Sequence, residues 1–186
     1  SRWALPMLPT PGLIQDTFPA KITAQNNNNS FYANCITGGE YLAGTDVLSV
    51  HLAGPLAMAN ADMKGGGLYI RSDLNDSMVF RCAGDGCGPP ADDPTSGAAA
   101  ITYPINATFY YVRPYSPVVG DGIPTLMRSF LTPQGTITSE PLVEGVAHMQ
   151  IQLGFDSEAD GVVDRYVDSS KAALGDFRIP DNMKKW

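Results

Sequence analysis

Residues 149–155 read Met149-Gln150-Ile151-Gln152-Leu153-Gly154-Phe155, and this stretch decides the fold class. Apolar and polar residues alternate along it, which is the period of a β-strand that buries one of its faces. We therefore expect its four apolar side chains to face a core, and Gln150 and Gln152 to face away from it. A strand of this kind is typical of an antiparallel sheet with one solvated face.

Strand patterns also occur elsewhere in the chain. The alternation over residues 45–52 predicts a strand whose apolar side chains share the buried face of the 149–155 strand, namely Leu48, Val50 and Leu52. Its polar side chains are expected to point outward, namely Ser49 and His51. Shorter strands are expected at 68–71, 78–82, 107–113, 126–131 and 162–167, the first two joined by a turn at 73–76. Helix is scarce, and only 141–148 and 169–174 have a composition that suits one or two turns.

Glycine and proline are frequent in the rest of the sequence. There are 19 glycines and 15 prolines in 186 residues, so the chain turns often and a helical bundle is not expected. Residues 83–100 are expected to form a long surface loop. We predict a single β-dominated domain over 1–186, with an extended, loop-rich lead-in at 1–42, an antiparallel sheet core at 43–168 and a tail at 169–186.

Charge and motif content exclude several functions. The net charge is −7 without a cluster of lysine and arginine, so binding to nucleic acid is not expected. No apolar run reaches the ~18 residues that a membrane span needs. No nucleophile elbow, phosphate-binding loop or zinc-protease motif occurs, and His51 and His148 are better explained as solvated or structural residues. We therefore predict that the chain is not an enzyme.

Three cysteines bear on the compartment. Cys82 and Cys87 bracket the flexible sequence Ala-Gly-Asp-Gly, which allows the close approach that a disulfide needs and favours an oxidising compartment. Metal ligation is the rival interpretation, and pairing of Cys35 with either of them stays open. We predict the Cys82–Cys87 bond, with Cys35 as a free thiol.

The sequence just after the 149–155 strand is acidic. Residues 156–168 hold five of the 19 acidic residues, with carboxylates at positions 1, 3, 5 and 9 and glycine at position 6. This is the first half of an EF-hand-type calcium loop, although Val167 stands where the bidentate glutamate would be. The expected ligands of a Ca²⁺ ion are Asp156, Glu158, Asp160, the Val162 carbonyl and Asp164, with Asp168 or water completing the shell. The alternative is an acidic, solvated turn.

The same region carries a resemblance to a known family. Residues 142–156 lead into the acidic turn and Val163-Asp164-Arg165-Tyr166-Val167, and together they resemble the signature of PilW-like minor pilins of bacterial type IV pili. Two upstream segments are similar to other parts of that family in the right order: residues 43–50, and Tyr110-Tyr111-Val112 followed by 124–128. The resemblance spans residues 43–168.

The resemblance implies an α+β pilin head: a β-sheet domain carried by a long N-terminal hydrophobic helix, which is absent from this chain. In that family the helix first anchors the precursor in the inner membrane and then packs into the filament. It also implies a minor structural subunit that helps to prime assembly near the pilus tip, with other pilins as partners and a periplasmic or extracellular location. The family usually continues past the position of Trp186 with another apolar strand, and it usually has aspartate at the position of Glu158.

Three alternatives accompany this interpretation. One is a type II secretion pseudopilin, which shares the helix-plus-sheet plan. Another is a surface adhesin that contacts its ligand through loop 83–100 or through Tyr103, Tyr110 and Tyr115. The third is a calcium-dependent hydrolase, for which the sequence offers no pair of nucleophile and base.

Overall fold

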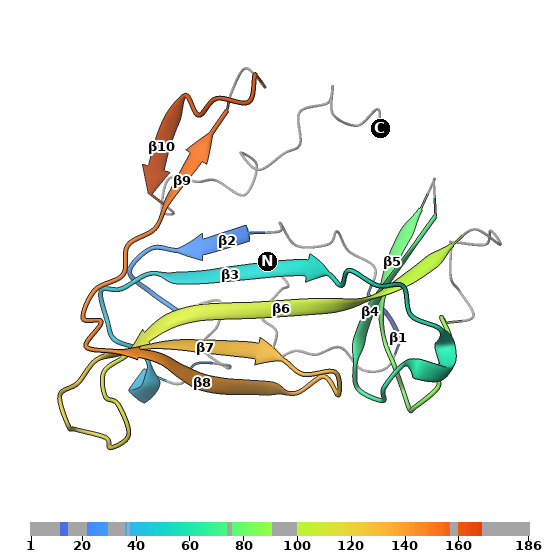
Figure 1. The fold of residues 1–186 in the computed structure, drawn as a ribbon, viewed down its shortest axis with the longest axis horizontal. Coiled ribbons are helices and arrows are strands. Elements are labelled where there is room, and N and C mark those ends of the chain that lie inside the picture. The colour runs from blue at the N-terminus through green and yellow to red at the C-terminus, as the bar shows by residue number, and fades with distance from the viewer. Residues whose placement is uncertain are drawn as a thin grey trace. The chain divides into compact units, whose positions relative to one another are not determined.

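A computed structural model describes residues 12–14, 22–29, 36, 38–73, 76–90, 100–156 and 160–168 of the chain. These ranges contain ten strands and two short 3-10 helices (Figure 1). The strands are β1 (Gly12–Ile14), β2 (Ile22–Gln25), β3 (Val47–Ala53), β4 (Leu68–Ser72), β5 (Ser77–Arg81), β6 (Ile101–Arg113), β7 (Thr125–Leu131), β8 (Ile137–Glu144), β9 (Gln152–Phe155) and β10 (Arg165–Asp168). The 3-10 helices are η1 (Gly38–Glu40) and η2 (Asn60–Asp62). Neither has the length or the apolar composition that a membrane span would require, and no other helix occurs in the described ranges.

Eight strands form one sheet and two form another. In the larger sheet the order is β1-β5-β4-β6-β3-β2, with β7 paired to β6 and β8 paired to β7. β9 and β10 pair with each other. The pairs β1–β5, β4–β5, β4–β6 and β9–β10 are all antiparallel. The β-dominated, antiparallel architecture expected from the sequence is thus confirmed, whereas the α+β pilin plan stays a prediction.

The chain divides into two compact units. The first holds the described parts of 1–21, 50–109 and 128–140, and the second holds those of 22–49, 110–127 and 141–186. Strands β3, β6, β7 and β8 each contribute residues to both. The division of the chain into lead-in, core and tail stays a prediction.

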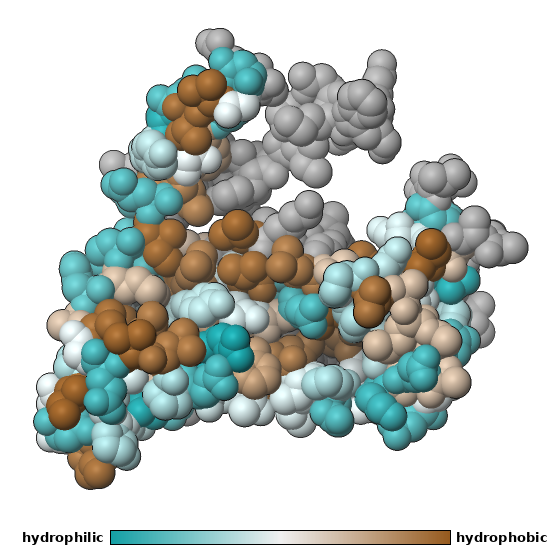
Figure 2. Space-filling model, viewed as in Figure 1, coloured by the Kyte–Doolittle hydropathy of each residue, from teal (hydrophilic) through white to brown (hydrophobic). Residues whose placement is uncertain are grey.

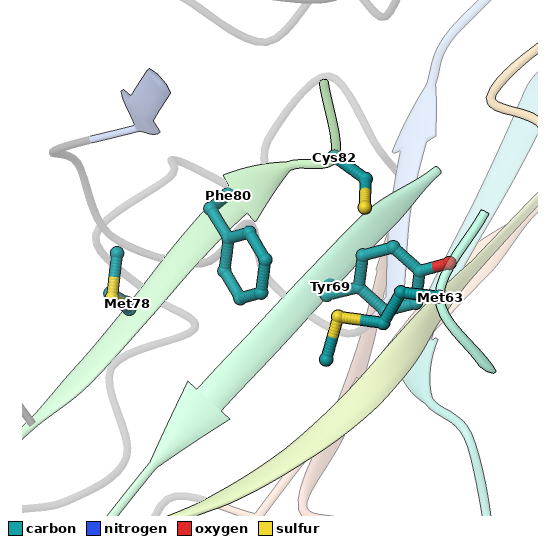
Figure 3. Close-up of a cluster of buried hydrophobic side chains, with 5 residues drawn as sticks. All are labelled: Met63, Tyr69, Met78, Phe80 and Cys82. Carbon is teal, nitrogen blue, oxygen red and sulfur yellow. The ribbon is translucent and has the colours of Figure 1, made fainter. Parts of the chain in front are cut away.

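The first unit has a core on one face of the β4–β5 hairpin. Tyr69 of β4 lies opposite Phe80 of β5, with ring centroids 5.8 Å apart. Figure 3 shows these rings together with the other buried members of the cluster, which are Met63, Met78 and Cys82. The Tyr69 hydroxyl accepts a hydrogen bond of 2.7 Å from the backbone N–H of Lys64, so the buried phenol is satisfied. The hairpin is as the sequence predicts, and the Asp76 N–H is bonded to the Asp73 carboxylate between its two strands; residues 74 and 75 of the predicted turn lie outside the described residues.

The predicted orientation of β3 is wrong. The buried side chains are Val47, Ser49 and His51, while Leu48 and Val50 are half-buried and Leu52 is 50% exposed. His51 is only 7% exposed, and its ring packs edge-on against Phe109 with centroids 6.0 Å apart. An imidazole has an apolar body, so burial against an aromatic ring is favourable once its nitrogen atoms are hydrogen-bonded. Hydropathy alone therefore predicts the wrong face of β3 as the buried one.

The helical turns suggested for 141–148 are also wrong, because β8 occupies Ile137–Glu144. Pairs with β7 hold this strand: the hydroxyls of Ser129 and Ser139 lie 2.6 Å apart, and Arg128 forms an ion pair of 2.7 Å with Glu140. Pro141 is tolerated because β8 is paired only with β7 among the described strands, and an edge strand can accept a residue without an N–H.

The 149–155 stretch is only partly a strand. β9 begins at Gln152, and residues 149–151 belong to no strand. The predicted alternation holds in direction, since Ile151, Leu153 and Phe155 are half-buried while Gln150 and Gln152 are exposed. The expected shared face with β3 is wrong, because β9 pairs only with β10 in the described part of the chain. The strand expected at 162–167 is shifted to Arg165–Asp168.

Candidate functional site

A buried aspartate holds the start of the β9–β10 hairpin in place. Asp46 is fully buried, and its two carboxylate oxygens accept hydrogen bonds from the backbone N–H groups of Asn27 (2.9 Å) and Ile151 (2.7 Å). Its own N–H donates to the Met149 carbonyl at 2.9 Å. Three segments far apart in sequence therefore meet at one side chain, and hydrogen bonds to a charged acceptor are the stronger kind.

Side chains around Asp46 extend this network. The amide nitrogen of Gln150 donates to the Asn27 side chain and to the Gly44 carbonyl, both at 3.1 Å. The Tyr41 hydroxyl donates to the Thr45 carbonyl, and the Thr45 hydroxyl donates to the Leu42 carbonyl at 2.8 Å. Burial raises the pKa of Tyr41, and the charge of Asp46 adds to the rise. The role of Asp46 was not predicted from the sequence. The signal that could have indicated it is an acidic residue directly before a predicted strand.

The β9–β10 hairpin that follows this anchor is short, and its two faces carry different side chains. Phe155 pairs with Arg165 and Leu153 with Val167, and the Arg165 guanidinium lies 5.5 Å from the centre of the Phe155 ring. On the other side, Tyr166 pairs with Gly154. A Cβ atom on Gly154 would lie 3.0 Å from Val163 and 3.3 Å from Tyr166, so these two side chains cover the glycine.

The acidic turn at the tip of the hairpin is organised by its own carboxylates. Asp156 accepts hydrogen bonds from the N–H groups of Asp160 (3.2 Å) and Gly161 (2.7 Å), and Asp160 accepts one from Val162 (2.8 Å). Gly161 has φ +87°, a conformation that glycine adopts without strain. The Asp164 N–H donates to the Phe155 carbonyl and closes the turn. The chain thus curls around Asp156, as the calcium-loop interpretation requires.

The predicted ligands are not all in one place. Asp156 is half-buried, whereas Asp160, Val162 and Asp164 are exposed. Asp168 pairs with Gln152 at the opposite end of the hairpin, three residues below Phe155 and so about 10 Å from the turn at ~3.3 Å per residue. Glu158 lies outside the described residues, and within them no three acidic, histidine or cysteine side chains gather as a metal site would need.

The cysteine pair forms a second ordered region. Cys82 and Cys87 are joined by a disulfide, with their Cα atoms 5.7 Å apart. Hydrogen bonds fix the ring to a neighbouring turn: Gly86 N–H to the Met63 carbonyl at 2.9 Å, and Gly65 N–H to the Asp85 carboxylate at 2.8 Å. Cys35 lies outside the described residues, so its predicted free state stays a prediction.

A third region is the loop between β6 and β7. Asp121 accepts hydrogen bonds from the N–H groups of Ser116, Val118 and Ile123, while Arg113 donates to the Tyr115 and Ser116 carbonyls. The bond from Ile123, followed by those from Ser116 and Val118, holds the pKa of Asp121 below its usual value. The Ser116 hydroxyl donates to Glu144, which ties the loop to β8.

The residues named for the alternatives are placed as follows. Tyr103, Tyr110 and Tyr115 are half-buried, and Tyr115 stacks on Arg113 with the guanidinium 4.4 Å from the ring centre. Residues 91–99 of the long loop lie outside the described residues. His51 is buried and His148 is exposed.

Together these observations describe a β-dominated chain with a disulfide and an acidic hairpin that is anchored at Asp46. Residues 109–185 match the model of the PilW family, described as "Type IV Pilus-assembly protein W". The PilW-like assignment made from the sequence is therefore confirmed over this region, which includes the end of β6, strands β7 to β10 and the acidic turn. No curated protein and no solved structure matches the chain.

Proposed function

We propose that this chain is a minor structural subunit of a bacterial type IV pilus that helps to prime assembly and contributes to the tip. The PilW match over residues 109–185 carries the proposal, because that family is named for pilus assembly and the matched region holds the whole acidic hairpin. The role is structural, and its partners are other pilin and minor pilin subunits. The precursor is held in the inner membrane, and the protein then acts in the cell envelope and the extracellular pilus.

Deletion of the gene tests this role. Electron microscopy should show loss of pili in the deletion strain and their return on complementation, with gold-labelled protein at filament ends. Pili that are unchanged in number and length would contradict the proposal. A defect in protein secretion with normal pili would support the pseudopilin alternative, and a positive glycan array would support the adhesin.

We further propose that the acidic turn binds Ca²⁺. The ion would be held by the carboxylates of Asp156, Glu158, Asp160 and Asp164 and by the Val162 carbonyl. Water, rather than Asp168, completes the shell, because Asp168 is paired with Gln152 at the other end of the hairpin. The turn supports this, because the Asp156 carboxylate accepts the N–H groups of Asp160 and Gly161 and so holds two of the acidic residues in one short turn. The ion would relieve repulsion among carboxylates and stiffen the tip.

Thermal unfolding with Ca²⁺ or a chelator tests the site. At a hundredfold excess over a dissociation constant of about 10⁻⁵–10⁻³ M, the ion should stabilise the fold by about 2.7 kcal/mol. Asp160→Ala should abolish the shift, while Asp168→Ala removes the same charge from the far end of the hairpin and should keep it. If Ca²⁺ does not stabilise the wild type, or if both variants lose the stabilisation equally, the calcium proposal fails and the segment is an acidic turn without a bound ion.

A further inference from the structure

The β9–β10 hairpin exposes an apolar face that its own fold does not cover. Tyr166 is 66% exposed and Val163 is 43% exposed, and both lie over Gly154. Val162, in the adjoining turn, is 63% exposed. Figure 2 shows hydrophobic surface on this hairpin beside hydrophilic surface. We call Gly154, Val163 and Tyr166 the Tyr166 face.

The fold has a physical reason to need a partner here. A two-stranded hairpin is marginally stable in water unless a third strand or another surface covers it. In the described part of the chain no third strand joins β9 or β10. The opposite face, with Leu153, Phe155 and Val167, is half-buried, so it is the Tyr166 face that remains for an external partner. Exposed tyrosine surrounded by smaller apolar groups is typical of the centre of a protein interface.

The hairpin is also held ready for contact. Asp46 fixes its base through the Ile151 N–H, and Gln150 adds two hydrogen bonds to the same region. A surface that is ordered before binding loses less conformational entropy when a partner docks.

Charge selects the kind of partner. Residues 152–168 carry five acidic side chains and one basic side chain, Arg165. Even with one Ca²⁺ ion bound in the turn, these side chains keep a net negative charge. Two copies docked through this hairpin would bring like charges together, which opposes such a contact. A partner with an apolar centre and lysine or arginine at its rim matches both features.

We propose that the Tyr166 face is a docking surface for a different, basic subunit of the same pilus, and not for a second copy of this chain. This proposal rests on the proposed function and names the partner chemistry of that role. The apolar centre supplies most of the affinity, and the acidic rim excludes self-association and orients the partner.

The first experiment compares strains that carry the full-length protein as their only copy. Tyr166→Ala should lose pili, whereas Val119→Ala, which trims a side chain that is also highly exposed, should keep them. The melting temperature of Tyr166→Ala should match the wild type, and a lowered value would overturn the assignment of this side chain to binding. If the deletion strain lacks pili but Tyr166→Ala makes them normally, the inference fails and the proposed function stands. If the deletion strain keeps its pili, the proposed function itself fails.

The second experiment identifies what touches the face. A photocrosslinking amino acid at position 162, beside the intact Tyr166, should form an adduct with another pilus subunit, on a peptide that contains lysine or arginine. The same amino acid at the exposed position of Thr138 on β8 serves as the control and should give none. An adduct with a second copy, no adduct at 162, or equal adducts at both positions would overturn the inference.

Discussion

Replacement of Asp46 tests the anchor of the hairpin most directly. Asp46→Ala removes two hydrogen bonds to a buried carboxylate, of 2.9 and 2.7 Å, and leaves the N–H groups of Asn27 and Ile151 without that acceptor. Each bond to a charged acceptor contributes about 1.5–3 kcal/mol. Because Asn27 is exposed, water replaces part of the loss, and we expect a net destabilisation of about 3 kcal/mol. For a chain of this length, that lowers the melting temperature by about 6–12 °C.

Two measurements check this expectation. Circular dichroism follows thermal unfolding, and amide hydrogen exchange reports the Ile151 N–H, which should lose protection. Asp46→Asn keeps the shape but offers one acceptor in place of two, so its effect should be intermediate. Asp62→Ala removes an exposed aspartate in η2 and should change stability by less than about 0.5 kcal/mol. Equal stability of Asp46→Ala and Asp62→Ala, or unchanged protection of Ile151, would refute the anchor.

Three further predictions concern turns and loops. Gly135→Ala should destabilise the protein strongly, because the added Cβ would lie 1.8 Å from a carbonyl oxygen of the facing turn. The control Gly120→Ala places its Cβ in open space and should cost only the ~1–2 kcal/mol of a positive φ. Comparable melting temperatures for the two variants would contradict the close approach at Gly135. The double variant Cys82→Ser with Cys87→Ser should lose about 2 kcal/mol, as expected for a short ring, in urea unfolding against the oxidised wild type. The lowered pKa of Asp121 means that its contribution to loop stability is present above pH ~4 and is lost as the pH falls through the folded value; amide shifts of the loop should follow that titration, and Asp121→Asn should abolish it.

Elements governed by local chemistry could be predicted from the sequence. The β4–β5 hairpin follows from two apolar runs around the turn at 73–76, and the aromatic run at 107–113 lies within β6. The disulfide follows from a short, flexible spacer. In each case residues that are close in sequence are also close in space, so a local sequence pattern is enough to predict the contact.

Features that depend on distant residues could not be predicted in this way. The orientation of β3 depends on Phe109, which lies more than fifty residues away and gives His51 an aromatic surface. The strand at β8 depends on its pairs with Arg128 and Ser129 of β7, which outweigh the weak helical composition of 141–148. Asp46 looks like an ordinary acidic residue until Asn27 and Ile151 are brought to it by the fold. The choice between Asp168 and water as the last calcium ligand also depends on the fold, because strand pairing decides where Asp168 lies; the ligand set itself stays a prediction.

The small size of the disulfide ring has a consequence for the order of events when the chain is made. Cys82 and Cys87 are five positions apart, so the two thiols meet by diffusion of a segment that closes in about 10–100 ns, long before sheet pairing is complete. A competing bond from Cys35 would have to close a much longer segment, and longer segments meet less often. Oxidation can therefore begin as soon as Cys87 enters an oxidising compartment, ahead of the strands that follow it. Once formed, the ring limits the conformations open to the turn at Met63–Gly67, to which it is hydrogen-bonded.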